Sequence, residues 1–284
     1  MDLSTSRSTP TNASSESLLA STPQAFTTGL AFSRAEVIAW CHNPDREIIS
    51  NDNVNPEVVK LGHLAIKHGR IMPMEGMNQR EAYRLLNPSI IRVPQVFDSF
   101  QSDGEGYLIM EYISAPANTQ FMDDACISAL RKALNHLHTF RGSVPGPVAG
   151  GPSKGLLWNE SQVPTFQTKE DLQQYMNDRL VDQSDCLQLQ DVDLVFSHLD
   201  IAPRNFRLLD NGAVCLFDWE SSGYYPRFFE LCALRLNNGD NGGDSLFSFL
   251  LERELRRQSP LASHEQRYFE LVLRVVWNGI RFPL

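Results

Sequence analysis

The sequence has few cysteines and no long apolar run, and these absences exclude several classes of protein. Its five cysteines are odd in number and scattered, and no two of them form a Cys-x-x-Cys pair. This pattern argues against a disulfide framework or a zinc site and favours a reducing compartment, so we expect a cytoplasmic protein. No stretch reaches about 18 apolar residues, and no charged segment precedes an apolar one at the N-terminus. We therefore expect neither a transmembrane helix nor a secretory signal.

Basic residues are also scarce relative to acidic ones. The chain carries 25 Lys and Arg against 34 Asp and Glu, a formal net charge of −9. Non-specific nucleic-acid binding needs clustered Lys and Arg, so we expect no nucleic-acid partner. An acidic cleft would attract a cationic substrate, although a charge of this size also serves ordinary solubility. Apolar residues make up 42% of the 284 residues, enough for one large domain or for two lobes around a cleft.

Residues 1–30 differ in composition from the rest of the chain. They are rich in Ser, Thr, Pro and Asn and poor in aromatic residues. Such a segment cannot bury enough apolar surface to offset the entropy lost on ordering, so we predict a disordered tail. A capping box formed by Ser33 and Glu36 then predicts the start of a short helix, and with it the start of the folded part of the chain.

The periodicity of apolar residues predicts an α+β fold. Runs with strand character occur up to residue 113, at 46–49, 57–61, 64–67, 93–100 and 107–113. One helix is expected among them, at 79–86, where Asn87-Pro88 ends it. Apolar residues then recur at helical spacing, and we predict helices at 127–140, 171–185, 226–236, 246–257 and 263–276.

Three polar side chains near residue 200 carry the strongest functional signal. Asp200 and Asn205 belong to one loop, and Asp218 follows after residues 206–217, which read as strand, Asn-Gly turn and strand. A hairpin brings its two ends together, so Asn205 and Asp218 are expected side by side. In kinases, an Asp accepts the proton of an attacking hydroxyl while an Asn and a second Asp hold Mg²⁺ on the nucleotide phosphates.

With these residues the sequence resembles the aminoglycoside phosphotransferase and choline kinase family, and more narrowly its fungal phosphotransferase-like branch. The matching text is His198-Leu199-Asp200, Arg204-Asn205, Phe217-Asp218-Trp219-Glu220 through Pro226, and Phe229-Glu230. The resemblance covers about residues 33–284. It implies a two-lobed, protein-kinase-like fold, with an N-lobe at 31–113 and a C-lobe at 114–284. It also implies ATP- and Mg²⁺-dependent phosphorylation of a hydroxyl on a small molecule.

The resemblance also implies a role for each residue of the site. Asp200 would act as the catalytic base, and Asn205 and Asp218 would be the metal ligands. Lys67 ends the stretch Leu64-Ala65-Ile66-Lys67, which resembles the Val-Ala-Ile-Lys strand of kinases, and would contact the α- and β-phosphates. Glu81, on the next predicted helix, would pair with Lys67 and hold it in place.

The segment Met110-Glu111-Tyr112-Ile113 resembles the hinge between the two lobes of the family. The backbone carbonyl of Glu111 and the backbone N–H of Ile113 would then bond to adenine, and Met110 would line the base pocket. Two further residues are expected to be structural. We expect the imidazole of His198 to bond to nearby backbone, and Glu230 to be an ion-pair partner.

Two departures from kinase patterns leave other functions open. The turn at 50–56 contains no Gly, whereas protein kinases cover the phosphates with a Gly-rich loop. Leu199 stands where the family most often has Gly. These features favour an alternative, a catalytically inactive, pseudokinase-like binding module. A protein kinase fits less well, because Trp-Glu follows Asp218 and no Ala-Pro-Glu segment is recognisable. The acceptor is not readable from the sequence, and its pocket is expected at 142–185 and the C-terminal helices.

Overall fold

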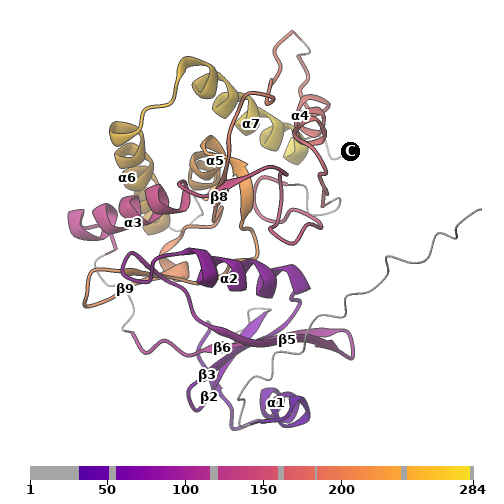
Figure 1. Ribbon diagram of the computed structural model, residues 1–284, viewed down its shortest axis with the longest axis vertical. Coiled ribbons are helices and arrows are strands. Elements are labelled where there is room, and N and C mark those ends of the chain that lie inside the picture. Colours follow the sequence, from indigo (N-terminus) through magenta and orange to yellow (C-terminus); the bar gives the residue numbers. More distant parts are fainter. Residues whose placement is uncertain are drawn as a thin grey trace, which may run out of the picture. The chain divides into compact units, whose positions relative to one another are not determined.

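The structure is a computed structural model that describes residues 32–50, 56–115, 121–158, 163–182, 184–237 and 242–281 (Figure 1). The predicted tail at 1–30 and most of the turn at 50–56 lie outside these residues. The described chain has the predicted α+β fold. An N-terminal lobe is built on one antiparallel sheet, and a C-terminal lobe is built mainly of helices.

The N-terminal lobe holds a five-stranded sheet with the order β1-β2-β3-β6-β5. Its antiparallel strands are β1 (Glu47–Ile48), β2 (Glu57–Leu61), β3 (Leu64–Gly69), β5 (Val96–Ser102) and β6 (Glu105–Glu111). The central strand β3 is buried along most of its length, and Lys67 lies on it opposite Leu108 of β6. The strands predicted here are confirmed, although β6 ends at Glu111 and Ile113 lies beyond it.

Two helices accompany this sheet. Helix α1 (Arg34–Cys41) begins with the predicted capping box. Helix α2 (Pro73–Leu85) begins earlier than the predicted residue 79. Proline favours the first position of a helix, because N–H groups there have no partner within the helix and proline has no N–H. In Figure 1, α2 lies between the sheet and the C-terminal lobe. A Cβ at Gly76 would lie 2.9 Å from Ser99 Oγ on β5, so glycine lets the helix approach the sheet this closely.

The C-terminal lobe buries its apolar residues among five helices. These are α3 (Asp124–Leu137), α4 (Lys169–Asn177), α5 (Phe228–Leu236), α6 (Gly242–Gln258) and α7 (Ser263–Arg281). Each of them was expected, but α4 ends well before the predicted residue 185. Helix α5 is buried almost all round, and it packs against both α6 and α7. It therefore forms the centre of the lobe, on which the functional loops rest.

Two small sheets carry those loops. One has the order β4-β10-β9, with strands β4 (Ile91–Arg92), β9 (Phe206–Leu208) and β10 (Val214–Leu216). The other has the order β11-β8-β7, with strands β7 (Arg141–Gly142), β8 (Leu194–Ser197) and β11 (Gly223–Pro226). Strands β9 and β10 are the predicted hairpin. Strand β4 pairs in parallel with β10, so a strand from the region 31–113 is built into a sheet of the second lobe.

The remaining expectations concern compartment and membrane. All five cysteines are free, and Cys215 is fully buried on β10, as expected for a small apolar side chain. Among the described residues, no helix combines the length and the apolar character needed to cross a membrane.

Candidate active site at two loops and helix α2

The loop that follows β8 is held in an unusual backbone conformation. Leu199 has a φ of +61°, in the left-handed region that favours glycine. Its backbone N–H and that of His198 both donate to the carboxylate of Glu230 on α5, at 3.1 and 2.8 Å. These bonds offset a backbone strain on the order of 1–3 kcal/mol. Glu230 thus holds the loop through backbone groups, and the ion pair expected of it is not what the structure shows.

His198 fixes the same loop from its other side. Its Nε2 donates to the carbonyl of Phe217 at 3.0 Å, and its Nδ1 accepts from the N–H of Asp200 at 3.3 Å. These partners require a neutral ring with the proton on Nε2. Burial lowers the pKa of His198, which favours that neutral form. The expectation that His198 bonds to nearby backbone is confirmed, and the ring joins the two segments that carry Asp200 and Asp218.

Asp200 lies at the end of this loop with its carboxylate held from two directions. Arg204 Nη2 donates to both carboxylate oxygens, at 2.8 and 2.9 Å. Asn205 Nδ2 donates to Asp200 Oδ2 at 2.7 Å and to the backbone carbonyl of Asp200 at 2.9 Å. The Asp200 side chain is 19% exposed, so the carboxylate is oriented by its neighbours and still open to solvent.

The hairpin brings Asn205 and Asp218 together, as the sequence predicted. Phe217 N donates to the carbonyl of Asn205 at 2.9 Å, directly before Asp218. Asn205 ends a short 3₁₀ turn, Pro203–Asn205, that leads into β9, while Asp218 follows β10. Asp218 also has a φ of +61°, a conformation that aspartate tolerates better than most residues.

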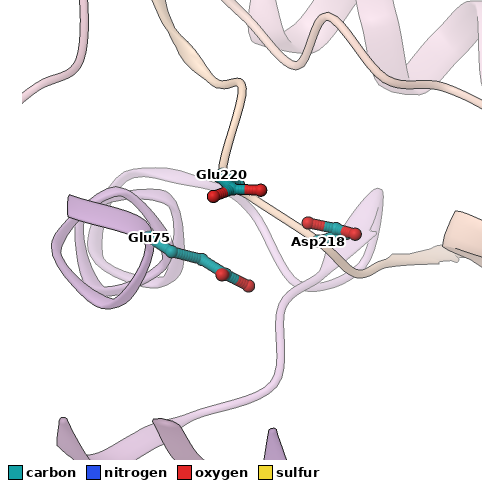
Figure 2. A group of neighbouring side chains, drawn as sticks. All are labelled: Glu75, Asp218 and Glu220. Carbon is teal, nitrogen blue, oxygen red and sulfur yellow. The ribbon is translucent and has the colours of Figure 1, made fainter. Parts of the chain in front are cut away.

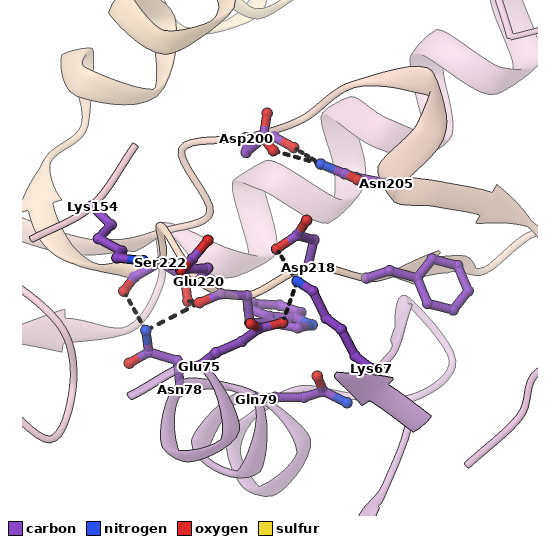
Figure 3. Close-up of polar contacts among 12 residues, drawn as sticks. Lys67, Glu75, Asn78, Gln79, Lys154, Asp200, Asn205, Asp218, Glu220 and Ser222 are labelled. Carbon is purple, nitrogen blue, oxygen red and sulfur yellow. Dashed lines mark hydrogen bonds and ion pairs between the residues drawn. The ribbon is translucent and has the colours of Figure 1, made fainter. Parts of the chain in front are cut away.

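Lys67 joins the N-terminal lobe to this centre. Its Nζ donates to Glu75 Oε1 at 2.8 Å and to Asp218 Oδ1 at 3.1 Å (Figure 3). Burial would lower the pKa of Lys67, but the two carboxylates outweigh it and the pKa is raised, so the side chain is a permanent cation. Burial also raises the pKa of Asp218, and here Lys67 more than offsets it, so the pKa is lowered. The structure thus brings Lys67 and Asp218, both predicted site residues, into direct contact.

The partner of Lys67 is Glu75, which corrects the pairing expected of Glu81. Glu81 bonds to Arg84 on its own helix, at 2.6 and 2.8 Å. The two glutamates are six positions apart on α2, and at 3.6 residues per turn they face different sides of it. The prediction of Glu81 was wrong because α2 begins at Pro73, before the predicted start, which places Glu75 in its first turn. Pro73 was the signal that could have located it.

Three carboxylates converge at this point, from Glu75, Asp218 and Glu220 (Figure 2). One oxygen of each lies within 4.8 Å of the others. Lys67 pairs with the first two, and Lys154, in the connection between β7 and α4, pairs with Glu220. Burial raises the pKa of Glu75 to about 7, and its Oε2 is buried without a hydrogen-bond partner. Neither Glu75 nor Lys154 was predicted from the sequence to be a site residue.

The expected hinge residues lie at the end of β6. Glu111 N donates to the carbonyl of Gln95 at 2.9 Å, and the Glu111 carboxylate bonds to Arg92 Nη2 at 2.6 Å. The Glu111 side chain is therefore engaged with β4. Met110 is mostly buried, 9% exposed, and its sulfur accepts from Gln79 Nε2 at 3.4 Å. Ile113 follows the strand within the connection to the C-terminal lobe.

A cavity of about 380 Å³ opens beside Asp200. Its lining includes Asp200, Arg204, Lys154, Glu220 and Trp158. The polar residues form two ion pairs, Arg204 with Asp200 and Lys154 with Glu220. The cavity thus lies partly within the region 142–185, where the sequence predicted the acceptor pocket.

Solved structures share this architecture at low sequence identity. A thermostable mutant of aminoglycoside phosphotransferase APH(4)-Ia, in a ternary complex with ADP and hygromycin B, matches with a TM-score of 0.59 and 13% identity over 86% of this chain and 88% of that one. An aminoglycoside-3'-phosphotransferase of type VIII matches with a TM-score of 0.50 and 18% identity over 85% and 97%. A candidate fructosamine-3-kinase from Haemophilus somnus 129PT matches with 0.52 and 13% over 84% and 86%.

These likenesses establish a two-lobed, protein-kinase-like fold. A search of curated protein sequences found no match. The sequence profile of the phosphotransferase enzyme family, in contrast, matches residues 48–265. That span includes every site residue described above and most of both lobes, and leaves out α1 and most of α7. With most of its length covered by this profile, the chain belongs to the phosphotransferase enzyme family.

Proposed function

We propose that the protein transfers the γ-phosphate of ATP to a hydroxyl group of a small molecule. The observation that carries this proposal is the contact of Lys67 with Glu75 and Asp218, next to Asp200 and Asn205 in the loop beside it. A cation fixed by two carboxylates, a base and two oxygen ligands are the parts that phosphoryl transfer needs. They come from β3, α2 and two separate loops, so the fold as a whole assembles them.

The oxygen ligands of the site fit Mg²⁺. Asn205 uses its Nδ2 as a donor to Asp200, which leaves its amide oxygen as the group available to a cation. Asp218 carries a carboxylate whose pKa is lowered, so it is ionised at neutral pH. A hard cation that takes amide, carboxylate and phosphate oxygens would be held by these two residues. When bound, it would neutralise negative charge on the phosphates.

Asp200 is the proposed base. Arg204 and Asn205 hold its carboxylate in one orientation, and the adjoining cavity gives an acceptor hydroxyl access to it. A positioned proton acceptor contributes on the order of 10²–10⁴-fold to the rate. Lys67 would contact the α- and β-phosphates. Met110, the backbone carbonyl of Glu111 and the backbone N–H of Ile113 would bind adenine, because they lie at the connection between the lobes.

The test is a thermal shift of the purified protein with ATP, with and without Mg²⁺, beside the variant Asp218→Ala. A ligand at 100 times its Kd adds about 2.7 kcal/mol of stability. We expect a Mg²⁺-dependent shift in the wild type that is lost in the variant. Absence of a shift over a wide range of ATP concentration would contradict nucleotide binding. An unchanged shift in Asp218→Ala would contradict the assigned metal site.

A catalytically inactive binding module is the competing function. An assay of phosphate transfer with the same purified protein distinguishes the two. A panel of small hydroxyl compounds, tested for phosphate transfer from ATP, should contain at least one acceptor. The first compounds to test are hygromycin B, which is bound in the APH(4)-Ia complex, and a fructosamine. ATP binding with no transfer to any of a broad panel would favour the binding module.

A further inference from the structure

Asn78 on helix α2 makes an unusual set of contacts. Its side chain is fully buried, with 0% exposure, and all three of its bonds leave the helix. Its Nδ2 donates to the backbone carbonyls of Trp219 and Ser222, at 3.1 and 2.8 Å (Figure 3). Its Oδ1 accepts from the N–H of Val148 at 3.0 Å. One side chain of the N-terminal lobe thus binds two backbone segments of the C-terminal lobe.

The position of Asn78 relates these contacts to the site. Asn78 lies three residues after Glu75, so both side chains share one face of α2, one turn apart. Glu75 holds Lys67, and Trp219 directly follows Asp218. A single turn of α2 therefore contacts the Lys67 ammonium at one end and the chain that carries Asp218 at the other. Movement of residues 218–222 away from α2 would separate Asp218 from Lys67.

We propose that Asn78 is a positioning residue, which fixes residues 218–222 on α2 and so keeps Asp218 in contact with Lys67. Its role in phosphate transfer rests on the function proposed above, whereas its effect on Lys67 does not. Protein kinases can move the corresponding elements, which gives control over whether the site is assembled. Here a buried amide holds the two elements together.

Asparagine suits this position because it offers two N–H donors and an opposed acceptor. Asn78→Ala would remove the Asn78 donor from the carbonyls of Trp219 and Ser222 and the Asn78 acceptor from the N–H of Val148, and only the Trp219 carbonyl would keep another donor, the Ser222 hydroxyl. Asn78→Asp would keep the volume of the side chain but set an oxygen against the carbonyls of Trp219 and Ser222. Either change favours displacement of residues 218–222, because unpaired buried polar groups are costly.

The first test measures the reactivity of Lys67 in the protein without nucleotide. Acetylation by a limiting amount of acetic anhydride is followed by mass spectrometry of the peptide that contains Lys67. In the wild type, Lys67 is 7% exposed and bound to two carboxylates, so it should react slowly. In Asn78→Ala and Asn78→Asp we expect the rate to rise about tenfold, the change that loss of such bonds can produce.

The control is a second asparagine, whose side chain also bonds to backbone groups but lies away from the site. Asn177 at the end of α4 donates to the carbonyl of Leu187 at 3.0 Å and accepts from its N–H at 2.8 Å. Asn177→Ala should lower the melting temperature without changing the reactivity of Lys67. Equal Lys67 rates in wild type and in both folded Asn78 variants would overturn the proposal. If Asn78→Ala does not fold, the acetylation rate of Lys67 in Asn78→Asp alone tests the proposal, by the same criterion.

A binding measurement separates this proposal from the function on which its role rests. Titration with Mg²⁺ and a non-hydrolysable ATP analogue, at a temperature where each variant is folded, should show about tenfold weaker binding in Asn78→Asp. Asn177→Ala should bind as the wild type does. Wild-type protein that binds no nucleotide would contradict the proposed function and leave the Lys67 labelling to decide on Asn78. Wild-type binding with an unaltered affinity in Asn78→Asp would contradict the positioning role.

Discussion

At the scale of single residues, the site depends on buried charges that the fold keeps in defined states. Glu230 is the clearest case, because it is fully buried and accepts from two backbone N–H groups instead of a cation. Burial raises its pKa to about 7, although the two N–H bonds oppose the shift. Glu230 thus supports the left-handed conformation of Leu199 at the cost of a strongly perturbed carboxyl group.

Glu230 should therefore make stability depend on pH. Its pKa is raised above the usual 4.5, so the folded protein keeps this proton to higher pH than the unfolded chain. The stability it contributes is greatest below pH 4.5 and is lost as the pH rises to about 7. In Glu230→Gln this loss should be absent, so the variant's free energy of unfolding should improve relative to wild type across that range. Urea titrations at several pH values measure the difference, and a constant difference would contradict the assignment.

Asp200 should be required for turnover and dispensable for nucleotide binding. Asn in its place keeps the shape but cannot accept a proton, so kcat should fall on the order of 10²–10⁴-fold. Affinity for the nucleotide should be unchanged. Asp210→Asn is a matched control, because Asp210 is an exposed residue at the tip of the β9–β10 hairpin, away from the site. An Asp200→Asn enzyme with wild-type kcat would show that another group accepts the proton.

At the scale of elements, the β9–β10 hairpin decides the spacing of Asn205 and Asp218. Its turn depends on Gly212, which has a φ of +78° and no atom within 4 Å of an added Cβ. Gly212→Ala should cost about 1 kcal/mol of stability from backbone strain alone. Gly104→Ala, in the β5–β6 turn, has a φ of +83° and equally open surroundings, so a similar loss is expected.

The pairing of β9 with β10, and not the turn between them, should determine the distance between Asn205 and Asp218. Three residue pairs join β9 to β10, and the last of them, Leu216 with Phe206, lies directly beside Asn205. We therefore expect Gly212→Ala to bind the nucleotide as the wild type does, when both are folded. Chemical denaturation and nucleotide titration of the two glycine variants provide the measurements. Weakened binding in Gly212→Ala alone would show that the turn controls the metal ligands.

Contacts of the site were predictable from the sequence where a local sequence pattern determines them. The contact between Asn205 and Asp218 follows from a hairpin that Asn211-Gly212 announces, so it was predictable. Lys67 was recognisable from its strand. Glu75 was not predicted because Gly76 weakens the helical pattern in the first turns of α2, although Pro73 marks its start. The partners of Asn78 lie 70, 141 and 144 residues away in sequence. No local pattern encodes such a contact, and only the packed structure reveals it.

At the scale of the whole molecule, several contacts make the two lobes depend on each other. Lys67 bonds to Asp218, Asn78 bonds to residues 219 and 222, and β4 pairs with β10. Each of these contacts joins the region before residue 113 to the region after it. The boundary expected at residue 113 stays a prediction, but the pairing of β4 crosses it.

These contacts predict that the lobes unfold together. In a urea series, pulsed hydrogen exchange should give the same midpoint for a peptide from β3 and for a peptide from α5. Coincident transitions in different probes are the mark of two-state unfolding. In Asn78→Ala the two midpoints should separate, because one of the links between the lobes is lost. Separate midpoints already in the wild type would contradict the mutual dependence.

The parallel pairing of β4 with β10 also bears on how the protein is made. Ile91 and Val214 are neighbours in the sheet but are synthesised far apart in time. While the ribosome adds the intervening residues, at about 5–20 per second, the edge of β4 has no partner. The small sheet that contains β4 therefore cannot form until β10 has been synthesised, whereas the five-stranded sheet needs no strand beyond β6. A pairing between strands so far apart in sequence is expected to form late, after the contacts within the five-stranded sheet.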